Sequence, residues 1–105
     1  MGRVIVMGFL QIRDGDLPRL QSTFDEFTTV TRAQPGCEHY SLSTDVKDPN
    51  IIRVVEIWTD RASQSMHLVG DHMVTFNLNM RRGKILKAAV DAFDSDGSVR
   101  KLIYM

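Results

Sequence analysis

The fold is decided by residues 34–77, which read QPGCEHYSLSTDVKDPNIIRVVEIWTDRASQSMHLVGDHMVTFN. The segment opens with Pro35-Gly36, a pair typical of a chain reversal. Two runs of strand-forming residues follow, 37–45 and 51–59, and the turn sequence Asp48-Pro49-Asn50 joins them. The second run, IIRVVEIWT, is the most β-prone part of the chain, so we expect a pair of adjacent strands here.

Helical patterns lie on both sides of these strands. Apolar residues recur in steps of three and four from position 17 to position 30, which predicts a helix over residues 17–34. Asp60 is placed to cap a second helix over 61–69, and Gly70 is placed to end it. A third helix should follow at once, and Gly83 is expected to break it.

The first and last segments complete a recognisable order of elements. Residues 3–12 are rich in β-branched and large apolar residues, and residues 99–104 resemble a final strand. Residues 84–93 fit helix or strand equally well. The predicted order is β-α-β-β-α-β with its second helix broken in two, which is the split βαβ, ferredoxin-like α+β fold. We expect one domain over residues 1–105, with helices on one face of a four-stranded antiparallel sheet.

The first strand is apolar on both of its faces. Val4, Val6 and Leu10 point one way, while Ile5 and Met7 point the other. A strand with one face in water alternates apolar with polar residues. One layer of helices cannot cover both faces, so we expect a homodimer joined through the open sheet faces or their edges.

The composition excludes several classes of partner. Basic and acidic residues balance at 13 each, so no overall charge draws the protein to nucleic acid or to an anionic membrane. The one cysteine cannot form an internal disulfide, which fits a reducing compartment. The apolar run near the N-terminus contains Gln11 and is too short to span a bilayer. These features favour a cytoplasmic protein.

Several side chains have both a chemical and a structural interpretation. Cys37 and His39 share a strand face and fit a nucleophile with its base, although a lone cysteine is more often a small buried residue. Trp58 and Glu56 fit a structural tryptophan beside a paired glutamate. His67 and His72 are five residues apart, about 140° on a continuous helix, which argues against a shared metal site. The glycines form no nucleotide-binding signature.

The quoted segment also resembles the antibiotic biosynthesis monooxygenase family. The resemblance rests on Pro35-Gly36-Cys37, Tyr40 and Asp48-Pro49, and above all on residues 56–62, EIWTDRA, followed by His67 and His72. It implies a dimeric α+β barrel. It further implies oxidation of phenolic, anthrone- or quinol-like aromatics by O₂ without flavin, haem or metal. The haem-cleaving branch of the family needs a tryptophan after the third strand, where this chain has Gln64 instead.

Such chemistry needs a base, donors that stabilise an anion, and an apolar cavity. The candidate catalytic residues are His67, His72 and Asn77, of which either histidine titrates in the right range to act as the base. Asn77, Tyr40 and Arg53 are the candidate donors. The candidate wall residues are Trp58, Phe76 and Phe9. Two other functions remain open on this fold: a small-molecule-binding protein without catalysis, and an isomerase or cyclase that uses the same histidines.

Overall fold

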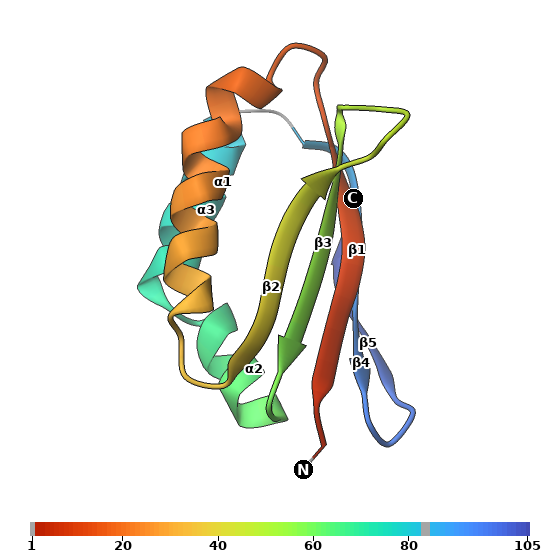
Figure 1. The fold of residues 1–105 in the computed structure, drawn as a ribbon. Helices are drawn as coiled ribbons and strands as arrows, with labels where there is room; N and C mark the ends of the chain where they lie inside the picture. The colour runs from red at the N-terminus through yellow and green to blue at the C-terminus, as the bar shows by residue number, and fades with distance from the viewer. Residues whose placement is uncertain (1, 83–84) are drawn as a thin grey trace.

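The protein folds as one antiparallel sheet covered by helices on one face, as Figure 1 shows. The computed structural model describes residues 2–82 and 85–105, so the expected break at Gly83 lies outside the described residues. In chain order the elements are β1 (Val4–Ile12), α1 (Leu17–Arg32), β2 (Cys37–Thr44), β3 (Ile51–Trp58), α2 (Arg61–Leu68), α3 (Asp71–Arg82), β4 (Ile85–Asp94) and β5 (Val99–Tyr104).

The sheet has the order β2-β3-β1-β4-β5, and each neighbouring pair is antiparallel. The α+β class and the split βαβ topology are therefore confirmed, with β1 at the centre. The expected count of four strands is wrong, because β4 pairs along the whole of β1 and takes the place assigned to the last strand. Residues 99–104 form an additional edge strand beside it. Pairing with β1 thus settles β4 as a strand.

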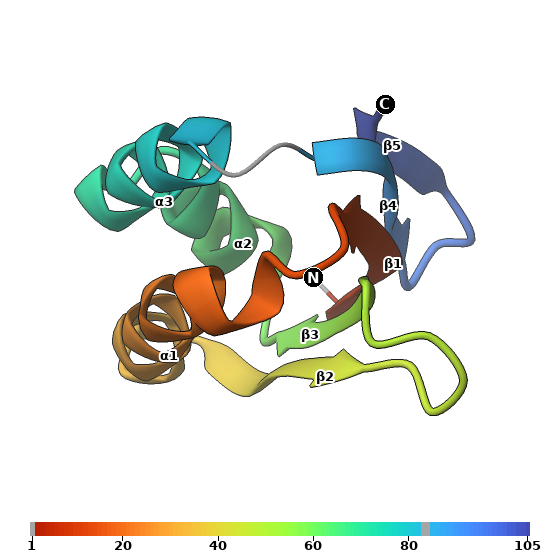
Figure 2. The same cartoon turned by 90° about the horizontal axis from the view of Figure 1, so that it is seen from above.

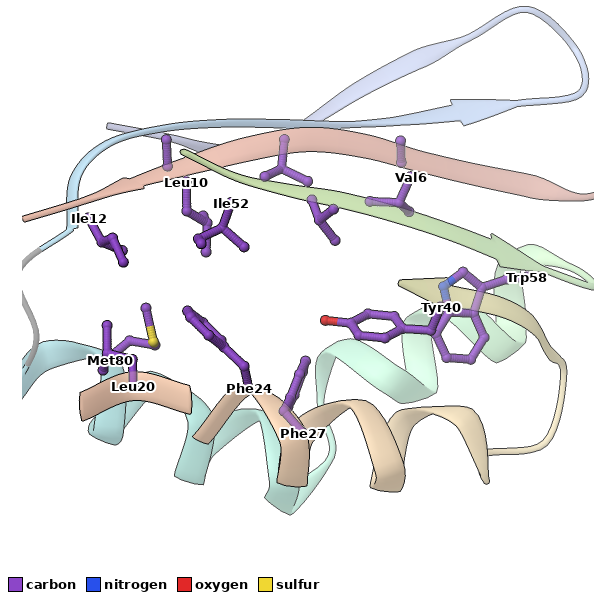
Figure 3. Close-up of a cluster of buried hydrophobic side chains, with 14 of the residues drawn as sticks. Val6, Leu10, Ile12, Leu20, Phe24, Phe27, Tyr40, Ile52, Trp58 and Met80 are labelled. Atoms are coloured by element: carbon purple, nitrogen blue, oxygen red, sulfur yellow. The ribbon is translucent and has the colours of Figure 1, made fainter. Parts of the chain in front are cut away.

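The core lies between the sheet and the helices, and Figure 3 shows its main side chains. Alternate residues of β1 and β3 face the helices because successive side chains of a strand point to opposite sides. Phe24 and Phe27 of α1 pack against them from below, and Met80 joins them from α3. The core-facing residues of the two central strands are Val4, Val6, Leu10, Ile12, Ile52, Val54, Glu56 and Trp58.

None of the helices in the described residues covers the opposite face of the sheet, as the view in Figure 2 shows. The register places Ile5 between Ile57 and Phe93, and Met7 beside Val55. Ile5 is 40% exposed and Met7 is 50% exposed. The prediction of an apolar open face is therefore confirmed for the isolated chain, and it follows directly from the two-sided pattern of β1.

Candidate functional site

Trp58, His67 and His72 come together near the end of β3, where α2 and the first turn of α3 pack beneath the sheet. The ring centroids of Trp58 and His67 are 4.8 Å apart, and those of the two histidines are 5.1 Å apart. The Asp60 side chain caps α2 by accepting a hydrogen bond from the backbone of the first turn, as expected. The chain then bends at Gly70 before α3 begins. This bend brings two histidines of separate helices together.

A chain of polar contacts runs inward from His72 to Glu56. His72 Nε2 lies 3.1 Å from Nδ1 of His67. The same Nδ1 lies 2.8 Å from Oε1 of Gln34, in the turn after α1. His67 Nε2 lies 3.8 Å from Oε1 of Glu56. That oxygen accepts a hydrogen bond of 2.8 Å from the indole N–H of Trp58.

Burial sets the charge of these groups. Glu56 is 8% exposed and His67 is 1% exposed. Burial raises the pKa of Glu56 to about 7, although the hydrogen bond from Trp58 acts in the opposite direction. Burial, together with the neighbouring His72, lowers the pKa of His67 to about 4. Near pH 6 both groups are neutral, so the contact places a proton donor beside an acceptor and is not an ion pair.

His72 also lines a groove between α1 and α3. The groove has a volume of about 230 Å³. Phe27 lines it, and its ring centroid lies 4.1 Å from that of Phe76 and 5.3 Å from that of His72. Val30 was expected in the buried stripe of α1, but it is 45% exposed and faces this groove, while Thr31 is buried instead. The groove is lined by Thr23, Glu26, Phe27, Val30, His72, Thr75, Phe76 and Asn79.

Tyr40 belongs to the same aromatic cluster from the β2 side. Its ring meets Phe27 edge-on, with centroids 5.7 Å apart, and lies 6.3 Å from the ring of His67. Figure 3 shows its hydroxyl directed into the layer between the sheet and α1. Burial, and next the nearby Glu56, raise the pKa of this phenol, so Tyr40 keeps its proton at neutral pH.

Of the eight sequence-predicted site residues, two line the groove, namely His72 and Phe76. Trp58, His67 and Tyr40 pack in the aromatic cluster next to it. The other three lie away from both. Asn77 is exposed on the outer side of α3, because it follows Phe76 by one residue, or about 100° of helix. Phe9 and Arg53 are register partners on the open face of the sheet, where Arg53 forms an ion pair with Asp45 at 3.2 Å. These side chains therefore do not share a pocket with His72. Strand alternation places them on the side without helices.

Sequence reasoning did not assign three residues that contact this cluster. Glu56 was interpreted as structural, although its position two residues before Trp58 on a buried face was a signal of unusual surroundings. Phe27 was visible only as one member of the apolar stripe of α1. Nothing in the sequence singled out Gln34, because its contact with His67 spans 33 positions and depends on how the turn at Pro35 closes.

The remaining features of the described chain are negative findings. Across residues 2–82 and 85–105, no group of three or more His, Cys, Asp or Glu side chains is arranged to hold a metal ion. No helix in that part of the chain is both long and apolar enough to cross a membrane. Cys37 donates to the carbonyl of His39, and burial raises the pKa of its thiol, so the pair lacks the thiolate that a nucleophile requires.

Comparison with known proteins identifies the class of this fold. An antibiotic biosynthesis monooxygenase of solved structure is 24% identical and has a TM-score of 0.80, with 88% of this chain and 97% of that chain covered. A conserved protein from Methanosarcina mazei is 17% identical, with a TM-score of 0.82 and coverage of 90% and 93%. A protein from Mycobacterium tuberculosis is 21% identical, with a TM-score of 0.78 and coverage of 88% and 93%. These likenesses establish a shared fold.

The family follows from a sequence model rather than from these structures. The model of the antibiotic biosynthesis monooxygenase family matches residues 3–77. The chain therefore belongs to the antibiotic biosynthesis monooxygenase family, as its residues 56–72 indicated. The comparison with curated proteins found no match. The matched range ends within α3 and includes every residue of the polar chain from Gln34 to His72.

Proposed function

We propose that the protein is a cofactor-independent monooxygenase that oxidises a phenolic, anthrone- or quinol-like aromatic compound with O₂. Family membership supports this proposal. The observation that carries it is the position of His72, whose ring lines the groove and whose Nε2 contacts the buried His67. An imidazole with one side on a ligand site and the other on a buried proton acceptor is suited to general base catalysis.

The reaction begins with loss of a proton from the substrate. An anthrone or phenol becomes an electron-rich anion, and this anion gives an electron to O₂ directly. For an anthrone, the CH₂ group becomes a carbonyl, one oxygen atom of O₂ enters the product, and the other leaves as water with the two hydrogens. The four electrons that reduce O₂ all come from the substrate. The protein must therefore supply a base and a dry, apolar site.

The groove offers apolar walls and a candidate base in a small volume. Phe27 and Phe76 form apolar walls on which an aromatic ring can stack, and His72 lies at one side as the base. Thr75 and Asn79 provide polar groups for substrate oxygens. A volume of about 230 Å³ favours a small, flat ligand. His67, Trp58 and Tyr40 lie behind this wall and hold the base in place.

The test is oxygen uptake by chelator-treated protein with 1,8-dihydroxyanthrone and with hydroquinone. We expect uptake above the uncatalysed rate, unchanged by the chelator, and formation of the anthraquinone from the anthrone. Binding of the anthrone without oxygen uptake would contradict the proposal and favour a binding protein. Rearrangement of the anthrone to its enol without oxygen consumption would favour an isomerase.

We also propose that two copies associate through their open sheet faces. The face carries an apolar patch on its three central strands, where Ile5, Met7, Val55, Ile57 and Phe93 adjoin one another. Charged side chains flank this patch, with Asp91 beside Met7 and Arg53 beside Phe9. A second copy fits this surface because the same apolar patch then covers itself, as in most symmetric dimers. A stable interface of this kind buries on the order of 2,000 Å² or more in total. A monomer at micromolar concentration in sedimentation equilibrium would contradict this assembly.

A further inference from the structure

The buried contacts extend the site well beyond the groove. Glu56 lies at the inner end of the series of polar contacts that starts at His72, and it has no role in the function proposed above. We propose that Glu56 is the final acceptor of the substrate proton, which reaches it through His72 and then His67. This inference rests on the proposed oxygenase function, and it assigns the place where the proton is held while the anion reacts with O₂.

In this transfer each imidazole gains one proton and loses one, so both rings are neutral once the transfer is complete. Before transfer, His72 carries its hydrogen on Nε2 and donates to Nδ1 of His67, while His67 carries its hydrogen on Nε2 and faces the Glu56 carboxylate. The substrate then gives a proton to Nδ1 of His72, the ring nitrogen that lies beside Gly70. His72 passes its Nε2 hydrogen to His67, and His67 passes its own to Glu56. Both rings finish neutral in the opposite tautomer, and Glu56 finishes as the acid.

Gln34 favours the state after transfer. In that state His67 carries its hydrogen on Nδ1, where Oε1 of Gln34 lies 2.8 Å away and accepts it. Before transfer the same Nδ1 carries no hydrogen, so it cannot form a hydrogen bond with that oxygen, which is also an acceptor. The glutamine therefore acts as a positioning residue that favours the Nδ1–H tautomer of His67, which is the tautomer present when Glu56 holds the proton. One gap must close, since 3.8 Å between His67 and Glu56 is about 1 Å longer than a hydrogen bond.

The surroundings of Glu56 suit a group that gains and loses a proton near neutral pH. Trp58 donates to it within β3, and the register places Tyr40 of β2 beside it. Several titratable groups from the surrounding elements interact electrostatically with these residues. Cys37 and Tyr40 of β2 interact with Glu56, His67 of α2 interacts with His72, and Asp71 of α3 interacts with His72. Burial brings the proton affinity of Glu56 close to neutrality, whereas that of His67 stays too low to trap the proton.

The direct test measures tautomers and needs no substrate. Protein labelled with ¹⁵N-histidine is followed by long-range ¹H–¹⁵N NMR between pH 6 and pH 8.5. We expect His67 to stay neutral and to change from the Nδ1–H to the Nε2–H tautomer as Glu56 loses its proton. Glu56→Gln should hold one tautomer across this range. His39→Gln is the matched control, because the ring of His39 is exposed and contacts Ser41 rather than the histidine pair, and it should leave the change intact.

A change of tautomer that persists in Glu56→Gln, or its absence in the wild type, would overturn the inference. Titration of His67 to imidazolium in this pH range would also overturn it. Kinetics separate the inference from the function on which it rests. Glu56→Gln should lower the rate of anthrone oxidation by about 10²-fold, within the range for loss of proton transfer. Oxidation unaffected by Glu56→Gln would refute the relay alone, and no oxidation by wild type with the tautomer change intact would refute the oxygenase alone.

Discussion

Replacing Glu56 with glutamine should change how the stability of the protein depends on pH. The glutamine keeps the shape of the side chain and an oxygen that accepts the Trp58 hydrogen bond. It removes the carboxyl group, which is the member of the Glu56–His67 pair that becomes negatively charged in the buried site. The carboxyl group has a pKa of 4.5 when unperturbed and about 7 in the folded protein. The folded state therefore holds this proton more tightly than the unfolded state does.

The sign and the size of the effect follow from this difference. Between pH 4.5 and pH 7 the folded state binds more protons, so the contribution of Glu56 to the free energy of unfolding is greatest below pH 4.5. It is lost as pH rises through 7. Each tenfold change in proton affinity corresponds to about 1.4 kcal/mol, so the whole effect is about 3 kcal/mol. His67 acts in the opposite direction as pH falls from 6.5 to about 4, but it does so in both proteins.

Urea unfolding of wild type and Glu56→Gln at pH 5 and pH 9, at one protein concentration, measures this effect. We expect the variant to gain on the wild type by about 2–3 kcal/mol between the two pH values. The comparison cancels every other titrating group that the two proteins share. An equal difference in free energy at both pH values would show that Glu56 is already ionised at pH 5, and would refute the reasoning about its burial.

Trp58→Phe removes the hydrogen bond that lowers the pKa of Glu56, so the infrared C=O band of its protonated carboxyl should persist to higher pH than in wild type; a band lost at lower pH would contradict this. Gly8→Ala should lower the free energy of unfolding in urea by about 1–3 kcal/mol, because a Cβ there meets the carbonyl oxygen of Ala89 in the neighbouring strand; unchanged stability would show that β4 shifts to admit the methyl group at no cost. Met7→Lys should convert the proposed dimer to monomer in sedimentation equilibrium, whereas a lysine at the exposed Val74 of α3 should not; dissociation by both or by neither would contradict the open-face interface.

Much of the framework could be predicted because local patterns and tertiary structure agree. The two-sided strand β1 indicated an uncovered sheet face, and the alternation along β3 placed Glu56 and Trp58 among buried residues. Residues 84–93 resisted prediction because their alanines and lysines favour a helix, whereas Ile85, Val90 and Phe93 favour a strand. Pairing with β1 decides between the two. That choice also decided the number of strands.

The site depended on features that sequence spacing conceals. On one continuous helix, His67 and His72 would point in different directions. The bend at Gly70 places them on two helices instead and brings their ring nitrogens to within 3.1 Å of each other. The groove lies between α1 and α3, whose packing angle no local pattern gives. Phe9 and Arg53 had suitable chemistry, but strand alternation directs them to the opposite face of the sheet. Residue type indicated the kind of site, but tertiary packing decides which of the candidate residues share it.

In the proposed mechanism, His72 removes the proton from a substrate held in the groove between α1 and α3. The most direct measurement compares oxygen uptake with 1,8-dihydroxyanthrone by wild type, His72→Gln and His39→Gln across pH 5 to pH 9. We expect His72→Gln to lose about 10²–10⁴-fold in rate at equal folded fraction, and His39→Gln to match the wild type. An equal rate in wild type and His72→Gln at every pH would contradict the claim.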